Sequence, residues 1–344
     1  MAIAPAEPVQ GAANVATWQQ SLRDAVRDPV ELCQLLELPA VYATRAAAAA
    51  GSFGLLAPRE FVARMRKGDP NDPLLQQVLP VPDEEAQVPG FVADPVEDAR
   101  ATTSPGLLQK YQGRALMVTT GHCAVHCRYC FRRHFAYDQS PRVWRDWEPA
   151  LARIAADRSI DEVILSGGDP LVLSDRWLGR FAARLAEIGH LRRLRVHTRL
   201  PIVIPSRVVQ ELIAWLKGTR LTAWMVVHAN HAQELDDDVA AALSRLVDAG
   251  IPVLNQSVLL AGVNDSVEVL EELCRRLVEL RVMPYYLHQL DRVAGAAHFE
   301  VPTAKGVALI EALSARLPGY ALPRYVREAP GAASKLPLLP DAGM

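Results

Sequence analysis

The chain has 344 residues, half of them apolar, which is enough to bury a large core in one or two domains. Its net charge of −2 and its scattered basic residues give no overall nucleic-acid or membrane-surface signature. The sequence contains neither a basic-then-apolar leader nor a run of about 18 apolar residues, so it predicts a cytoplasmic protein without a membrane span.

Residues 1–105 read as short helices separated by proline and glycine, followed by a proline-rich acidic linker. From Arg114 onward, short apolar runs alternate with amphipathic helical segments. The predicted strands lie at 114–120, 161–167, 194–199, 223–229, 252–260 and 284–290. This alternation predicts an α/β fold, a partial (β/α)6 barrel with a helical N-terminal extension, and a doubly wound sheet is the alternative. We expect three parts: 1–105, the barrel at 106–320, and a short C-terminal segment at 321–344.

Three cysteines, Cys123, Cys127 and Cys130, lie together in GHCAVHCRYCFRRHF. Three thiolates at this spacing can bind three irons of a [4Fe–4S] cluster and leave the fourth iron open to a small molecule. The familiar small molecule for such a loop is S-adenosylmethionine (SAM), which predicts a radical enzyme. Zinc with a nearby histidine as fourth ligand is the serious alternative, whereas a disulfide would leave one of the three cysteines unpaired.

Polar residues recur where the predicted strands end, and barrel enzymes place their chemistry at the carboxyl ends of their strands. Gly167 and Gly168 would let the backbone approach a ligand closely and present N–H groups to an anion, although such a pair is often only a turn. Tyr129, between two cysteines, has a ring that can cover a cluster and adenine. The candidate SAM contacts are Tyr129, Gly167, Gly168, Asp169, Arg199 and His228.

Three more charged residues are candidates for the site. Arg132 directly follows the last loop cysteine and can form a bidentate pair with a carboxylate, although a surface arginine is common in so arginine-rich a chain. Asp291 follows the sixth predicted strand, and its alternative role is a helix cap or turn. Lys335 lies in the small-residue segment APGAASKLP, where a solvated lysine is the alternative.

Four motifs together resemble the lysine 2,3-aminomutase family of radical SAM enzymes: KYQGRALMVTTGHCAVHCRYCFRRHF, LSGGDPL, PYYLHQLD and EAPGAASK. The resemblance runs from about Lys110 to Lys335. LHQLDRV and GAAHFEV are most similar to the bacterial branch that makes (R)-β-lysine for modifying elongation factor P. The resemblance implies an isomerase that converts L-α-lysine to β-lysine. It also implies three cofactors: a [4Fe–4S] cluster, SAM and pyridoxal phosphate (PLP).

The resemblance assigns roles by position. The three loop cysteines match the cluster ligands, and Lys335 matches the lysine that binds PLP, so the C-terminal segment carries the cofactor lysine. Arg132 matches the arginine at the substrate carboxylate, and Asp291 and Glu328 match two acids at the side-chain ammonium. The other implied PLP contacts are Lys110, Tyr111, Arg114 and Gln256. Glu328 stands where free-standing aminomutases typically carry aspartate, which lengthens that side chain by one methylene.

The implied partners are L-lysine, a reductant such as flavodoxin or ferredoxin, and, through function, elongation factor P with its lysyl-transferring ligase. We expect neither nucleic acid nor a membrane as a partner, and a homo-oligomer stays open. Two acids facing one end of a substrate repel each other unless a cation lies between them, which favours lysine over acidic amino acids but leaves arginine and ornithine open. A radical SAM enzyme without PLP and a non-catalytic zinc module remain as alternatives.

Overall fold

The computed structural model describes residues 17–51 and 53–339. Its centre is one sheet of ten strands, and their order across the sheet is their order along the chain. The strands are β1 (Thr102–Ser104), β2 (Leu107–Leu108), β3 (Arg114–Val118), β4 (Glu162–Ser166), β5 (Arg193–His197), β6 (Thr222–Val227), β7 (Val253–Val258), β8 (Met283–His288), β9 (Arg324–Arg327) and β10 (Leu336–Pro337). A doubly wound sheet reverses its strand order at a switch point, and this sheet has no such reversal, so the barrel prediction is confirmed.

Strands β3 to β9 are parallel to one another, and β3 to β8 correspond to the six predicted strands. The seventh parallel strand, β9, was not predicted from sequence, because its four residues, RYVR, carry an arginine at each end and form no apolar run. Antiparallel strands flank this set: β1 and β2 precede β3, and β10 returns along β9. The last antiparallel pair sets the position of the C-terminal segment.

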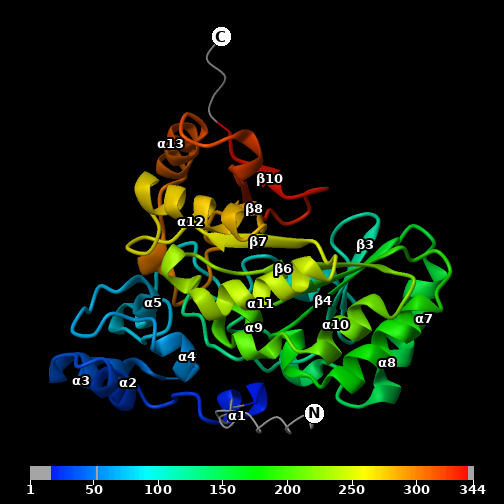
Figure 1. Cartoon of the computed structure of the whole chain (residues 1–344), viewed down its shortest axis with the longest axis horizontal. Coiled ribbons are helices and arrows are strands. Elements are labelled where there is room, and N and C mark those ends of the chain that lie inside the picture. The colour runs from blue at the N-terminus through cyan, green and yellow to red at the C-terminus, as the bar shows by residue number, and fades with distance from the viewer. Residues whose placement is uncertain (1–16, 52, 340–344) are drawn as a thin grey trace, which may run out of the picture.

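Helices connect and cover the strands, and α8, α10 and α11 pack along one side of the sheet in Figure 1. The helices of the barrel are α7 (Glu148–Ala156), α8 (Asp175–Ala186), α9 (Leu200–Val203), α10 (Gln210–Lys217), α11 (Asp237–Asp248), α12 (Val267–Glu279) and α13 (Thr303–Ser314). Side chains of Ser174, Asp236 and Ser266 accept backbone N–H groups at the starts of α8, α11 and α12, which fixes where these helices begin. No helix in the described part of the chain is long and apolar enough to cross a membrane.

The two faces of the barrel strands differ in burial. On β5, Leu194 and Val196 are buried in the main hydrophobic core, whereas Arg195 and His197 on the other face are half-buried. Alternate residues of a strand point to opposite faces of the sheet. The inner face of this strand is therefore polar.

The N-terminal helices share the main hydrophobic core of the barrel: Trp18, Leu32 and Phe61 belong to the same cluster as Phe181. These helices are α1 (Trp18–Arg23), α2 (Pro29–Leu35), α3 (Ala40–Ala49), α4 (Arg59–Val62), α5 (Pro73–Gln76) and α6 (Asp98–Ala101). In Figure 1, α1 to α3 lie at the opposite end of the molecule from β10. The predicted boundary at residue 105 falls inside the β1–β2 hairpin, and the three-part division of the chain stays a prediction.

Candidate active site

The cysteine loop directly follows β3 and lies against the turn after β4. Backbone hydrogen bonds join the two segments, from Gly168 N to Thr120 O (2.7 Å) and from Asp169 N to His122 O (2.7 Å). A Cβ atom at Gly168 would lie 2.2 Å from His122 O, so only glycine permits this approach. The prediction that Gly168 presents its N–H to an anion is wrong, because this N–H donates to Thr120 O in the cysteine loop. The role of Gly167 and Gly168 at SAM stays a prediction.

The three loop thiols are free and half-buried. Burial, followed by the charge of Cys127, raises the pKa of the Cys130 thiol to about 11, and burial with both neighbouring thiols raises that of Cys123 well above its usual value. Each thiolate therefore destabilises the others unless a cation joins them. The irons of a cluster would supply that charge, so the donor set fits the predicted group. Within the described residues, no three or more His, Cys, Asp or Glu side chains are grouped to hold a single metal ion.

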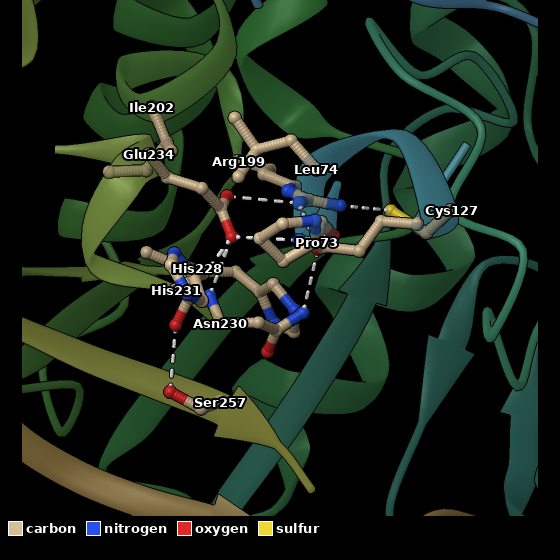
Figure 2. Close-up of polar contacts among 12 residues, drawn as sticks. Pro73, Leu74, Cys127, Arg199, Ile202, His228, Asn230, His231, Glu234 and Ser257 are labelled. Atoms are coloured by element: carbon tan, nitrogen blue, oxygen red, sulfur yellow. Dashed lines mark hydrogen bonds and ion pairs between the residues drawn. The ribbon is translucent and has the colours of Figure 1, made fainter. Parts of the chain in front are cut away.

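Arg199 contacts the cysteine loop directly. Its Nη1 donates to Cys127 Sγ at 2.7 Å, and its Nη2 donates to Glu234 Oε2 at 3.0 Å. Figure 2 shows the guanidinium lying between the carboxylate of Glu234 and the sulfur. Burial disfavours the guanidinium charge, yet Cys127, Tyr129 and Glu234 together raise the pKa of Arg199. A permanent cation thus lies beside one predicted cluster ligand, and its predicted contact with SAM stays a prediction.

Tyr129 and His228 lie next to this arginine at the same rim. The Tyr129 hydroxyl and His228 Nε2 are 2.9 Å apart, and their rings stack with centroids separated by 5.8 Å. Asn230 Nδ2 donates to the same hydroxyl at 2.7 Å. The structure thus brings together the predicted SAM contacts that follow β3, β5 and β6, although their binding of SAM is not tested.

Asp169 is a predicted SAM contact whose two carboxylate oxygens already accept hydrogen bonds within the protein. One carboxylate oxygen accepts from Thr198 Oγ1 at 2.7 Å and from Leu171 N at 3.0 Å. The other accepts from Arg199 N at 2.6 Å and from Leu200 N at 3.2 Å. The side chain therefore ties the turn after β4 to the end of β5, and a contact with SAM stays a prediction.

The C-terminal segment reaches the barrel through the β9–β10 pair. Leu336 pairs with Arg327, so Lys335 and Glu328 are the next opposed residues of the antiparallel ladder. Lys335 Nζ forms an ion pair with Glu328 Oε2. Six residues separate these two side chains in sequence, and only the hairpin places them face to face.

Glu328 is also joined to the start of β3. Tyr111 Oη donates to Glu328 Oε1 at 2.6 Å, and Lys110 Nζ lies 3.7 Å from the same oxygen. Lys110 Nζ is in turn 2.7 Å from Asp98 Oδ1, and Asp98 Oδ2 accepts from Arg132 Nε at 2.6 Å. We call the alternating series Lys335–Glu328–Lys110–Asp98–Arg132 the charge chain. It connects the predicted PLP lysine with the predicted substrate arginine.

Asp291 follows β8 and belongs to the same group of charges. Burial raises the pKa of its carboxyl to about 7, with Glu328 and Asp98 raising it further and Lys335 and Lys110 lowering it. The carboxyl of Asp291 is therefore buried within the electrostatic influence of Lys335 and Glu328, and its contact with a substrate ammonium stays a prediction.

The remaining predicted PLP contacts, Arg114 and Gln256, lie on barrel strands. The Arg114 guanidinium lies over the Tyr111 ring, 4.7 Å from its centroid. Gln256 pairs in register with Tyr286 and is half-buried. Contacts of both residues with PLP stay predictions.

Several residues that organise this site were missed by sequence reasoning. Asp98 and Glu84 lie in the segment interpreted as a linker, yet Asp98 is 1% exposed, and Glu84 pairs with Arg128 at 2.5 Å and with Arg133 at 2.7 Å. Gln77, from the N-terminal region, accepts from Arg199 Nη2 at 2.6 Å. An acidic, proline-rich segment looks solvated in sequence, and no local pattern distinguishes the buried carboxylates within it.

Residues 117–274, which include the cysteine loop, match the family described as the Radical SAM superfamily. Together with the partial barrel and the three thiols at its rim, this match defines the protein as a radical SAM enzyme and removes the zinc-module alternative. The chain is 45% identical over 93% of its length to an L-lysine 2,3-aminomutase of Escherichia coli (strain K12), of which 94% is covered. A Haemophilus influenzae L-lysine 2,3-aminomutase is 42% identical, with 97% and 98% covered, and one from Clostridium subterminale is 35% identical, with 94% and 78% covered. The chain belongs to the L-lysine 2,3-aminomutase family of isomerases.

These matches confirm the family that the sequence motifs predicted. They also imply the three predicted cofactors: a [4Fe–4S] cluster, SAM and PLP. The residues present fit them. The three thiols need a shared cation, and Arg199 lies beside one of them. Lys335 is half-buried at the inner end of a hairpin, with cationic Lys110 and Arg114 nearby in the polar barrel.

Proposed function

We propose that the protein is a PLP-dependent radical SAM aminomutase that converts L-α-lysine to β-lysine. The observation that supports the proposal is the charge chain, in which ion pairs link Lys335, the residue we propose for PLP, with Glu328 and with Arg132, the residues we propose for the ammonium and the carboxylate of the substrate. The relatives named L-lysine 2,3-aminomutase support the same substrate. A radical SAM enzyme without PLP would have no use for Lys335 at the end of such a chain.

The residues of the chain would bind lysine at both ends. Arg132 would hold the α-carboxylate through its guanidinium, and Asp291 with Glu328 would hold the side-chain ammonium. Lys335 Nζ and Glu328 Oε2 form an ion pair, so this carboxylate already lies where it can accept an ammonium group. When bound, the cluster with SAM supplies a hydrogen-abstracting radical, and PLP supplies the carbonyl chemistry that lets the amino group migrate.

We further propose (R)-β-lysine as the product and modification of elongation factor P, through its lysyl-transferring ligase, as its use in the cytoplasm. The resemblance of LHQLDRV and GAAHFEV to that branch supports this, and Glu328 in place of aspartate fits a pocket that differs from free-standing aminomutases. A flavodoxin or ferredoxin would supply the electron.

Anaerobic incubation with L-lysine, SAM, PLP and a reductant, followed by chiral analysis, tests this function. We expect β-lysine of the R configuration, and no product from L-ornithine or L-arginine at the same concentration. Borohydride should trap PLP on the wild-type protein and not on Lys335→Ala. If wild type and Lys335→Ala trap PLP equally, the assignment of Lys335 to PLP is wrong. If another cationic amino acid is turned over faster than L-lysine, the proposed substrate is wrong.

A further inference from the structure

The N-terminal segment contributes a buried carboxylate to the barrel interior, at Asp98. Its side chain is 1% exposed and lies between two cations, Arg132 and Lys110, both of which come from barrel residues. The two cations hold the pKa of Asp98 below its usual value although burial opposes them, so the group is ionised at neutral pH. A buried carboxylate that carries its charge is costly without such partners.

The geometry at Arg132 leaves its outer edge free. Asp98 Oδ2 takes the Nε–H at 2.6 Å, and Nη1 makes one longer hydrogen bond, 3.3 Å, to Ser166 Oγ. Within the described residues, Nη2 of Arg132 donates no hydrogen bond. A guanidinium held from its Nε side has a fixed plane and direction, with the remaining N–H groups available for a second anion.

The segment that carries Asp98 is itself fixed. Asp94 accepts the backbone N–H groups of Asp98 (2.9 Å) and Ala99 (3.0 Å), and Glu97 takes a left-handed backbone with φ of 53°. A residue with a Cβ atom is uncommon in that conformation, which indicates a turn held by its surroundings. Lys110 Nζ also donates to Val96 O at 2.8 Å, so this turn is bonded to the barrel on both sides of Glu97.

Asp98 is shared by two cations, because Lys110 Nζ lies 2.7 Å from Oδ1 and Arg132 Nε lies 2.6 Å from Oδ2. Its single negative charge therefore offsets only part of the positive charge of Arg132, and the part that remains attracts an anion.

We propose that Asp98 is a positioning residue that aims Arg132 at the α-carboxylate of the amino-acid substrate, which makes the N-terminal segment part of the catalytic centre. This role rests on the proposed function, because it takes Arg132 as the carboxylate site. Asp98 itself touches no substrate: it sets the plane of Arg132 and spaces Arg132 from Lys110. Its contribution is discrimination between substrates with and without the carboxylate charge.

The test compares binding of L-lysine and L-lysinamide, which lacks the carboxylate charge, to the PLP-loaded protein without reductant. The readout is the change in absorption of bound PLP, which gives a Kd for each ligand. A charge-assisted hydrogen bond changes affinity by roughly ten- to one-hundred-fold, so wild type should prefer lysine by at least about tenfold. Asp98→Asn should reduce that preference by about tenfold, whereas Glu97→Gln, which changes a neighbouring carboxylate that pairs with Arg100 outside the charge chain, should leave it unchanged.

Asp98→Glu keeps the negative charge and should retain most of the preference, which guards against a folding defect in Asp98→Asn. If Asp98→Asn weakens both ligands by the same factor, the residue is merely structural and the proposal is overturned. The same holds if Asp98→Glu loses the preference as fully as Asp98→Asn. If wild type itself shows no preference for lysine, the proposed carboxylate site at Arg132 fails first, and the role of Asp98 fails with it.

Discussion

The raised pKa of Asp291 predicts that lysine binding depends on pH. Moving the carboxyl pKa from 3.8 to about 7 corresponds to about 4 kcal/mol of preference for the neutral form in the empty site. Only the ionised form attracts an ammonium group, and with a pKa near 7 it makes up about one tenth of the population at pH 6 and about nine tenths at pH 8. An affinity that requires the competent form scales with its fraction, so the Kd for lysine should fall about tenfold as pH rises from 6 to 8.

The assay is titration of the PLP-loaded protein with L-lysine across that range, beside L-norleucine, which has the same chain without the side-chain ammonium. Other groups that titrate, including PLP and the α-amine, affect both ligands alike, so the ratio of the two Kd values isolates Asp291. The ammonium of lysine stays protonated throughout. Asp291→Asn should remove the pH dependence of the ratio. A ratio that is constant from pH 6 to 8 in wild type would refute the assignment of Asp291 to the ammonium.

Three further predictions follow from the cysteine loop. Gly168→Ala would put a Cβ atom against the carbonyl oxygen of His122, so it should lower the free energy of unfolding by several kcal/mol and cause loss of iron. The control is Gly189→Ala, whose added Cβ meets no atom within 4 Å, and its free energy of unfolding, measured by thermal unfolding, should stay within about 0.5 kcal/mol of wild type. Cys130→Ser should abolish iron and sulfide in anaerobically reconstituted protein, and Cys274→Ser, in the core, should retain them; equal loss in both would contradict the ligand assignment. Arg199→Gln removes a cation donating to a ligand sulfur and should lower the cluster reduction potential in an EPR-monitored titration, while Arg199→Lys should lower it less.

The strands and the cysteine loop could be predicted from sequence because their signals are local. Short segments in which apolar residues are continuous, as in β4, or alternate with polar ones, as in β5, indicate β3 to β8, because at least one face of each strand must be buried. The spacing of Cys123, Cys127 and Cys130 puts three thiols in one short loop. The strand β9 escaped prediction because its burial comes from its neighbours β8 and β10 and not from its own composition.

The sequence by itself therefore indicated the class of chemistry, the positions of six strands and the residues that end them, whereas the order of the strands across the sheet came from the tertiary structure. Tertiary structure alone decided which charges meet: Asp98, Lys110 and Arg132 from one half of the chain, and Glu328 with Lys335 from its end. Glu328 and Lys335 face each other only through the register of β9 and β10, and Tyr111 meets Glu328 across 217 positions of sequence. The physical reason is that the periodicity of apolar residues is set within a few neighbouring positions, whereas the pairing of buried charges depends on how distant segments of the chain pack together.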